Sequence, residues 1–454
     1  MNFRTDQQTL DDLHLLGRSN GRSIYDLYDN AHTRGGASLL ERMFLHPLSD
    51  AREINRRSSI IQYFVARRIP FPFKAEILDG AEAYLALTDQ RTMLSHADNT
   101  LSRKLSRLVS ADGQYAVILN GIGAIAGIVQ VLSQFVAEHS ASAQPTPYRE
   151  NLDAIAALLR HEACVVVHSE ATRGRLPYQK VVDLDKQLRF RHRQTILQLL
   201  EHVYALDVFL SVAKVAEEHH YVFPVALEKD RHTLTLTGVR HPLVSNAIGN
   251  SLSVTAQQNL VFLTGANMAG KSTFMKSVAI AFYVAHLGFP VAADSMEFSV
   301  ADGLYTTINL ADDLNSGISH FYAEVLRIKQ IAKELAGDKH LLILFDELFR
   351  GTNVRDAYEG TLAITQAFAT RSNCMFVVST HIIEAGEVLR RQCDRINFVF
   401  LPTRMDGNKP VYTYRLEAGI TADRHGMIII NNERILEIIR SRSKNAHSGG
   451  ANVT

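Results

Sequence analysis

The sequence predicts a fold of class α + α/β, in which an all-helical N-terminal domain precedes a domain with a mainly parallel sheet. Residues 1–225 carry apolar side chains at three- and four-residue spacing, which is typical of helices. From residue 226 onward, short β-rich runs alternate with helical segments, as they do where parallel strands are joined by helical crossovers. The predicted domains are therefore residues 1–225 and 226–440, and residues 441–454 are expected to form a disordered tail.

Local patterns predict the individual elements. Helical spacing is clearest over residues 197–212, and loops are expected at 140–147 and 172–177, where Pro or Gly accompanies small polar residues. Residues 232–237 alternate with period two, which predicts a strand that is buried on one face. Further strands are expected in four short apolar runs. These runs are residues 260–264, 341–345, 375–379 and 396–401.

The composition is that of an ordinary globular protein. Of its 454 residues, 46% are hydrophobic and 21% are charged, which excludes a disordered or collagen-like chain. Lys and Arg number 48 against 47 Asp and Glu, so the net charge of +1 excludes binding to nucleic acid by bulk charge alone. The three cysteines form no CxxC pair, and the polar N-terminus shows no signal peptide. We therefore expect no disulfide framework, no zinc site and a reducing, cytoplasmic location.

Residues 113–137 contain no charged side chain, and Gly123 and Gly127 form a GxxxG pattern. Two interpretations remain open, because a membrane span needs about 20 apolar residues and a buried helix of a helical core has the same composition. Polar side chains such as Asn120 and Gln130 recur through the segment, and no aromatic belt flanks it. We therefore favour the core helix and expect no membrane partner.

The strongest motif is G-x-x-x-x-G-K-[ST] at residues 265–272, between the predicted strand 260–264 and a helical run over 273–287. Its glycines allow the backbone to turn several N–H groups toward one point, and the following helix N-terminus adds positive potential. In such a loop Lys271 supplies a cation to the β- and γ-phosphates, and Ser272 offers a hydroxyl to Mg²⁺. The predicted nucleotide-binding residues are Gly265, Ala266, Asn267, Met268, Ala269, Gly270, Lys271, Ser272 and Thr273.

An acidic pair ends a second apolar run. Asp346 and Glu347 directly follow residues 341–345. An Asp that leaves a buried strand is well placed to hold Mg²⁺, and the adjacent Glu can orient and deprotonate an attacking water. His381, after the run 375–379, is a candidate sensor of the γ-phosphate, although an isolated histidine is weak support by itself.

Three segments in this order resemble the ATPase domain of the MutS mismatch-repair family, within the ABC-type ATPase superfamily. They are TGANMAGKST at 264–273, DELFRGTN at 346–353 and STH at 379–381. Upstream, residues 33–40 and the Pro-Leu pair at 47–48 resemble the start of the family's helical core domain. The resemblance implies a helical core and lever domain followed by an ABC-type P-loop ATPase domain.

The resemblance also implies ATP and Mg²⁺ as ligands, a homodimer, and a signature loop through which Ser319 reaches the nucleotide of the opposite subunit. Glu347, His381 and Ser319 are then the expected catalytic residues, and Ser272 and Asp346 the expected Mg²⁺ ligands. The implied function is ATP-dependent DNA binding in DNA mismatch repair or a related DNA-structure transaction, with other repair proteins among the partners.

The chain departs from the family pattern at several positions. Ala266 replaces the usual Pro, His320 stands where Thr is expected, and Phe349 replaces a Gly after the acidic pair. The aromatic residue that stacks on adenine in the family has no counterpart at residues 247–249. The chain also begins at the core domain, so we expect neither the family's mismatch-reading domain nor direct mismatch recognition.

Two basic clusters in the helical half are candidate DNA contacts. Arg189, Arg191 and Arg193 form one cluster, and residues 103–107 contain the other. A solvated helix face has the same pattern, whereas phosphate contacts would make DNA binding non-specific and sensitive to salt. Two other functions remain open: an ATP-gated dimerising scaffold that binds a partner without mismatch recognition, and the ATPase subunit of a transporter.

Overall fold

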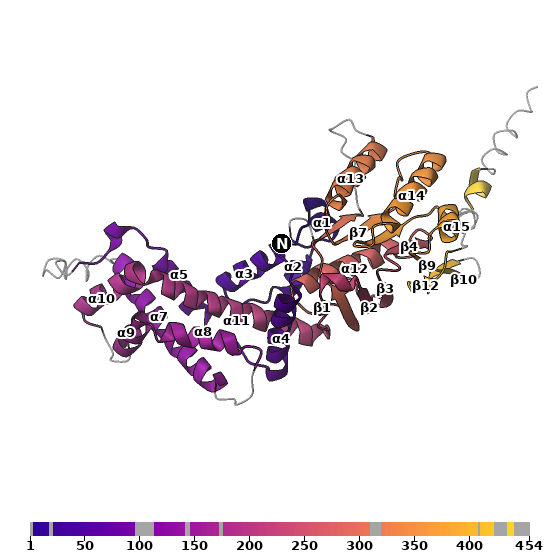
Figure 1. Ribbon diagram of the computed structural model, residues 1–454. Helices are drawn as coiled ribbons and strands as arrows, with labels where there is room; N and C mark the ends of the chain where they lie inside the picture. The colour runs from indigo at the N-terminus through magenta and orange to yellow at the C-terminus, as the bar shows by residue number, and fades with distance from the viewer. Residues whose placement is uncertain are drawn as a thin grey trace, which may run out of the picture. The chain divides into compact units, whose positions relative to one another are not determined.

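The computed structural model shows a chain that folds into two compact units (Figure 1). The helical unit comprises residues 25–45 and 56–220, and the sheet unit comprises residues 1–24, 46–55 and 221–454. The predicted combination of a helical part and an α/β part is confirmed. The structure describes residues 3–17, 21–95, 113–140, 146–171, 176–308, 319–406, 409–421 and 434–439.

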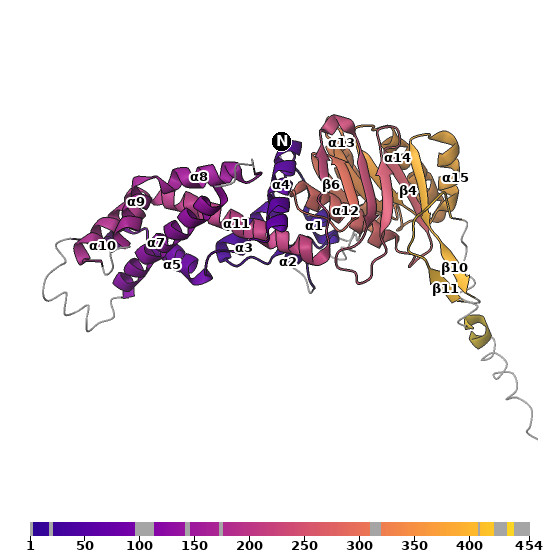
Figure 2. The same ribbon diagram turned by 90° about the horizontal axis from the view of Figure 1, so that it is seen from below.

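The helical unit is built from the helices that Figure 2 shows, and several of them enclose an apolar core. Buried side chains of α5, α7, α9, α10 and α11 meet in this core, and burying a Leu or Ile side chain stabilises the fold by about 1.5–3 kcal/mol. The helical spacing predicted over residues 197–212 lies within α11. The helices are α2 (Ile24–Tyr28), α3 (Arg34–Leu45), α4 (Ala51–Arg67), α5 (Ala75–Leu85), α7 (Gly113–Ser140), α8 (Arg149–Leu159), α9 (Glu162–Ala171), α10 (Tyr178–Asp185) and α11 (Arg193–His219), with short turns at Gln90–Thr92 and Lys186–Arg191.

The uncharged segment lies in α7, which packs against α5, α8 and α9. In the described part of the chain, Tyr115–Ser140 and Arg193–His219 are long and apolar enough to cross a membrane by length and composition. Within their apolar windows, 44% and 67% of the residues are buried inside the protein, and Asn120 and Gln130 lie on the exposed face of α7. The core of the helical unit therefore covers most of the apolar window in Arg193–His219 and less than half of the window in Tyr115–Ser140.

The sheet unit contains two sheets and a hairpin. In the six-stranded sheet, of order β12-β9-β4-β8-β7-β6, the strands β9, β4, β8, β7 and β6 run parallel and β12 is antiparallel. The four-stranded sheet, of order β1-β5-β2-β3, is mixed, and β10 pairs with β11. The four predicted apolar runs are β4, β7, β8 and β9. The strands are β1 (Val225–Leu227), β2 (Leu234–Val239), β3 (Asn250–Val254), β4 (Leu260–Gly265), β5 (Ser295–Ser299), β6 (Gly303–Thr307), β7 (Leu341–Asp346), β8 (Met375–Ser379), β9 (Ile396–Leu401), β10 (Thr403–Asp406), β11 (Lys409–Tyr412) and β12 (Glu417–Ala418).

Helices cover both faces of the six-stranded sheet. The helix α12 (Lys271–His286) packs against β4, β6 and β7 and also against β2 of the other sheet, so its side chains are buried almost all round. The helices α13 (His320–Leu335), α14 (Val354–Ala369) and α15 (Ile383–Gln392) cover the opposite face, as Figure 1 shows. The strands between these layers are buried on both faces, which explains why their sequences are continuous apolar runs.

The N-terminal segment packs in the sheet unit, although the sequence placed residues 1–225 in the helical domain. Arg4 bridges to the edge strand β6, and α1 (Gln7–Asp12) lies against the same strand. Asp6 forms a charge-assisted pair with Arg327 of α13, and Asp12 accepts hydrogen bonds from β6 and from the residue that follows it. The contacts thus divide the chain at residues 24, 45, 55 and 220 rather than once at residue 225. The expected tail, 441–454, lies outside the described residues.

Candidate functional site

Three adjacent parallel strands end at one edge of the sheet, and the predicted site residues follow them. The strand β4 leads into the glycine-rich loop at 265–270, β7 ends at Asp346 before Glu347, and β8 ends at Ser379, two residues before His381. Ligands of open parallel sheets bind at the carboxyl ends of the strands. The fold therefore gathers residues from three distant segments at the edge where a ligand is expected.

The glycine-rich loop curls through left-handed backbone conformations before α12 begins at Lys271. The φ angles are 151° at Gly265, 66° at Met268 and 99° at Gly270. A Cβ on Gly265 would lie 3.0 Å from the carbonyl oxygen of Leu401, so a larger residue would require strand β9 to shift by a few tenths of an ångström. The first N–H groups of a helix have no partners within it and carry its positive end. The loop and the start of α12 thus form a cradle of backbone donors that suits an anion.

Lys271 places a cation inside this cradle. Its side chain is buried, and its Nζ donates to the carbonyl oxygens of Gly265 at 3.0 Å and Ala266 at 3.2 Å. Burial lowers the pKa of the Lys271 ammonium, while the nearby carboxylates of Glu347 and Asp346 act in the opposite direction. A buried cation held by two loop carbonyls is positioned to neutralise phosphate oxygens.

Asp346 is the centre of an oxygen cluster at the end of β7. Ser272 of α12 donates its hydroxyl hydrogen bond to Oδ2 of Asp346, and Ser379 of β8 donates to Oδ1. The sequence interpretation had paired Ser272 with Asp346 and had missed Ser379, although Ser379 lies in the STH segment. Carboxylate and hydroxyl oxygens are the donor set that Mg²⁺ prefers, so this cluster fits a Mg²⁺ ion.

Glu347 lies on a strained turn beside His381. Its φ angle is 58°, and its N–H donates to the carbonyl oxygen of Ser379 at 3.0 Å. The Glu347 carboxylate is hydrogen-bonded to Nε2 of His381, and Nε of Arg350 lies 3.5 Å from its Oε2. The hydrogen bond to His381 lowers the pKa of Glu347 despite partial burial, so the carboxylate stays ionised at neutral pH and can accept a proton. Nothing in the sequence interpretation had singled out Arg350.

His381 joins the two halves of the site. Its Nε2 atom lies 3.5 Å from Nζ of Lys271 as well as against Glu347. Lys271, Ser272, Asp346, Glu347 and His381 therefore form one connected cluster, as the sequence interpretation required.

Ser319 occupies a different place from this cluster. It is the exposed N-cap of α13, and its Oγ accepts a hydrogen bond from the backbone N–H of Tyr322. The first turn of α13 packs on the segment after β7, because a Cβ on Gly351 would lie 2.7 Å from the backbone nitrogen of Phe321. In the described part of one chain, Ser319 thus contacts its own helix rather than Lys271.

A cavity of about 330 Å³ opens beside the glycine-rich loop. Its walls include Ile248 and Phe274, and the Tyr414 ring reaches within 3.0 Å of a Cβ built on Gly270. The amide of Asn250 holds the Tyr414 segment across the cavity, since its Nδ2 donates to the carbonyl oxygen of Tyr414 at 2.9 Å and its Oδ1 accepts from the N–H of residue 416 at 2.7 Å. Tyr414 thus places an aromatic ring in this cavity, whereas residues 247–249 contribute none.

The structure corrects one of the predicted DNA contacts. The Arg189 side chain is 1% exposed and forms two hydrogen bonds with Asp185, and further hydrogen bonds with Leu87 and Thr92, so it is not available to phosphate. Arg193 donates to the carbonyl oxygen of Leu85 and is partly buried.

Arg191, by contrast, has a side chain that is 69% exposed, with a guanidinium nitrogen 3.9 Å from Glu162. The other basic cluster, at residues 103–107, lies outside the described residues. Of the basic positions that the structure describes in these clusters, Arg191 is the one exposed enough to meet a phosphate.

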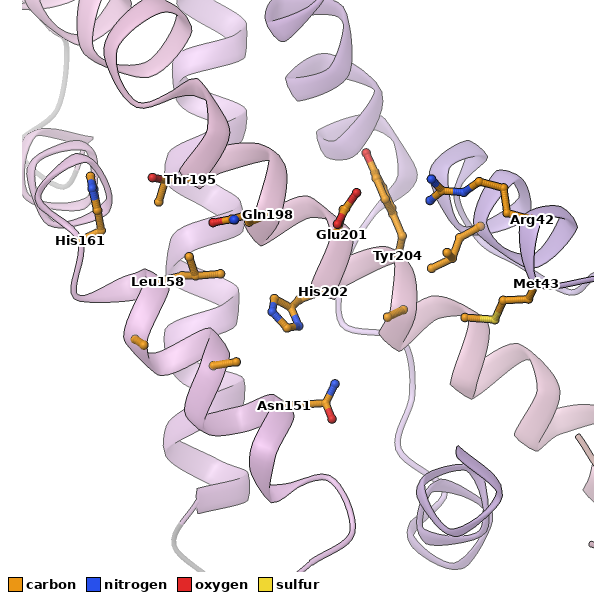
Figure 3. A pocket seen from close by; sticks show the side chains of 14 residues that line it. Arg42, Met43, Asn151, Leu158, His161, Thr195, Gln198, Glu201, His202 and Tyr204 are labelled. Carbon is orange, nitrogen blue, oxygen red and sulfur yellow. The ribbon is translucent and has the colours of Figure 1, made fainter. Parts of the chain in front are cut away.

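A second, wider cavity of about 930 Å³ lies in the helical unit between α3, α8 and α11 (Figure 3). Figure 3 shows Asn151 and His202 near its middle and Arg42 at its rim. Of the predicted nucleotide-binding residues, Ala269, Gly270 and Thr273 line the other cavity, and none of the predicted site residues lines this one.

Both units match domain models of one family. The model described as MutS domain III matches residues 8–213, and the model described as MutS domain V matches residues 261–448. The chain therefore belongs to the MutS family.

Curated relatives carry the same family name. The chain is similar to the DNA mismatch repair protein MutS of Streptococcus agalactiae, with 34% identity over 236 residues, 51% of this chain and 27% of the relative. It is similar to that of a Geobacillus species, with 27% identity over 292 residues, 63% of this chain and 33% of the relative. Streptococcus pyogenes has a relative with 34% identity over 219 residues, 47% of this chain and 25% of the relative. The chain thus spans about a quarter to a third of the length of these relatives.

Proposed function

We propose that the protein is a cytoplasmic, MutS-like ATPase that hydrolyses ATP at a dimer interface and thereby switches its grip on DNA. The observation that carries the proposal is the connected cluster of Lys271, Ser272, Asp346, Glu347 and His381 at the carboxyl ends of three parallel strands. The cluster combines an anion cradle, a buried cation, a set of Mg²⁺ ligands and an ionised carboxylate, which together are the parts that phosphoryl transfer to water needs.

In this proposal the sheet unit is an ABC-type P-loop ATPase domain. The backbone of residues 265–270 and the N-terminus of α12 bind the phosphates, and Lys271 neutralises their charge. Ser272 and Asp346 hold Mg²⁺, with Ser379 orienting the Asp346 carboxylate. When bound, Mg²⁺ offsets charge on the phosphate oxygens.

Glu347 is the proposed general base for the attacking water. The hydrogen bond from His381 fixes its carboxylate, and the low pKa keeps it ionised. His381 also reaches toward Lys271, so it is positioned to contact the γ-phosphate end of the nucleotide.

The proposed second subunit completes the site with its Ser319. Exposed apolar side chains support a partner at this face, because Val354 at the start of α14 is 82% exposed and Tyr322 in the first turn of α13 is 53% exposed. A symmetric dimer would bury both surfaces at once.

Replacing Tyr414 with alanine is expected to weaken ATP binding about tenfold, because base–aromatic stacking contributes about 1–3 kcal/mol. The turnover number at saturating ATP should change little, since neither Glu347 nor His381 lines the cavity that contains Tyr414. Binding of a fluorescent ATP analogue and steady-state kinetics measure the two effects. Tyr414→Phe keeps the ring, so it is the matched control and should retain wild-type affinity. Unchanged ATP affinity in Tyr414→Ala would show that the adenine ring does not bind in this cavity.

Charge reversal at Arg191 is expected to weaken DNA binding several-fold. The binding constant should also depend less steeply on salt, because a protein that makes one phosphate contact fewer releases fewer counterions when it binds. The measurement is a salt titration of binding to mismatched, branched and homoduplex DNA, with and without ATP. Arg390→Glu makes the same charge change on α15 and should bind DNA like wild type.

Equal binding by Arg191→Glu and wild type would reject Arg191 as a contact. If the wild-type protein binds none of these DNAs in any nucleotide state, the function is the alternative one, an ATP-gated dimerising scaffold for another partner.

A further inference from the structure

The turn after the acidic pair has an unusual residue at its centre. Phe349 has a φ angle of 62° and a buried side chain. The left-handed region favours glycine, and a bulky L-residue adopts it only at a cost in free energy. Such strain persists where surrounding contacts compensate for it. Glu347, two residues earlier, has a φ angle of 58°, so both residues that flank Leu348 are in this region.

The contacts of the Phe349 ring explain how this strained backbone conformation is maintained. On one side the ring packs on Phe321 in the first turn of α13, with centroids 5.8 Å apart. On the other side it lies directly on the backbone of α14, because a Cβ on Gly360 would be 2.8 Å from both Cδ2 and Cε2 of the ring. The ring is therefore wedged between two helices.

A polar contact ties the same turn to α13. The backbone N–H of Arg350 donates to Oε1 of Glu324 at 3.3 Å, and Glu324 is buried. Phe349 and Arg350 thus dock the turn on the first two turns of the helix that Ser319 caps. We call the contacts of Phe349 and Arg350 with α13 and α14 the junction. It connects the proposed base Glu347 to the proposed trans-acting Ser319.

We propose that Phe349 is a positioning residue, whose ring holds the 347–351 turn against α13 and α14 so that the placements of Glu347 and Ser319 are set together. The inference rests on the proposed function for the roles of these two residues. It goes beyond that function because it gives Phe349 a role of its own. Phe349 connects the 347–351 turn, which carries the proposed base, to α13, whose N-cap Ser319 is proposed to reach the partner subunit.

Gly360 provides the sharpest test, since a methyl group there must displace the ring. Gly360→Ala is expected to lower the turnover number about tenfold with little change in ATP affinity, because a small misplacement of a catalytic group reduces turnover. Phe349→Gly should lower turnover to a similar extent. In Phe349→Gly the added Gly360→Ala should have no further effect, because the ring that it displaces is absent.

The matched control is a glycine of another helix, at which an added methyl group crowds a different part of the sheet unit. A Cβ on Gly386 of α15 would lie 2.9 Å from Cε1 of Phe262, so Gly386→Ala adds equal crowding away from the turn. It should lower stability without changing the turnover number. Equal loss of turnover in Gly386→Ala, or additive losses in the Phe349→Gly/Gly360→Ala protein, would overturn the proposal.

Hydrogen exchange of the α13 amides tests the junction without any catalytic readout. Phe349→Gly and Gly360→Ala should each reduce the protection of residues 323–326, the first amides that bond within α13, and Gly386→Ala should not. Wild-type protection in both variants would refute the junction even if ATP hydrolysis is observed. If both variants lose protection but the wild-type protein does not hydrolyse ATP, the junction is supported and the proposed function is rejected.

Discussion

Replacing Glu347 with glutamine is expected to lower ATP turnover by about 100-fold or more, because a general base contributes factors of about 10²–10⁴ to such reactions. The amide has the shape of the carboxylate but cannot accept the proton from water. ATP binding should persist, since Lys271 and the glycine-rich loop are unchanged and the like charge facing the phosphates is removed. Single-turnover hydrolysis and nucleotide binding, measured on the same preparation, separate the two effects.

Glu359→Gln is the matched control for that substitution. Glu359 is exposed on α14 and paired with Arg355, so the same chemical change there should leave turnover at the wild-type level. Hydrolysis by Glu347→Gln at a wild-type rate would reject the assignment of the base, whatever the affinity for ATP.

Lys271→Ala is expected to weaken ATP binding about 100-fold, since truncating one partner of a buried charge contact costs about 2–5 kcal/mol. Among the described residues, Lys271 provides the ammonium group that bonds to the carbonyl oxygens of Gly265 and Ala266, and the alanine variant lacks this charge. Turnover should fall below detection. Isothermal titration with ATP and with ADP measures the loss, which should be present for both nucleotides.

The control for Lys271 is Lys333→Ala on the exposed face of α13, which removes the same charge from the same unit. It should bind ATP like wild type. ATP affinity that is equal in Lys271→Ala and wild type would show that the cradle does not bind the phosphates.

The sheet and the side-chain cluster around Lys271 and Asp346 are the parts that the sequence predicts best. The strands β4, β7 and β8 are buried on both faces, so each reads as an uninterrupted apolar run that ends at a polar residue. Because parallel strands present their carboxyl ends at one edge, Lys271, Asp346 and His381, which lie at or after these three ends, come close together.

The position of the N-terminal segment is beyond what local patterns predict. The segment 3–12 looks helical by spacing, but its partners are Arg327 and the strand β6, which lie about 300 residues away in sequence. Periodicity reports which face of a helix is apolar, and it carries no information about which distant element covers that face.

The burial of Arg189 and the approach of Tyr414 to the cavity could not be predicted, for the same reason. A run of arginines does not reveal which members face the core, although the i, i+4 spacing of Asp185 and Arg189 was a readable signal of an ion pair. Tyr414 lies 164 residues beyond Asn250 in the sequence, so the residues around 247–249 carry no sign of its place in the cavity.

The central claim, that two subunits build each ATP site, is tested most directly by mixing two inactive variants. Lys271→Ala disables the cradle of its own subunit, and Ser319→Asp keeps the helix cap but places a negative charge where the partner's phosphates would lie. Each variant alone should be inactive. In an equal mixture, mixed dimers contain one intact site, so about a quarter of the wild-type turnover should return. Turnover in the mixture that stays at the level of the separate variants would contradict the account.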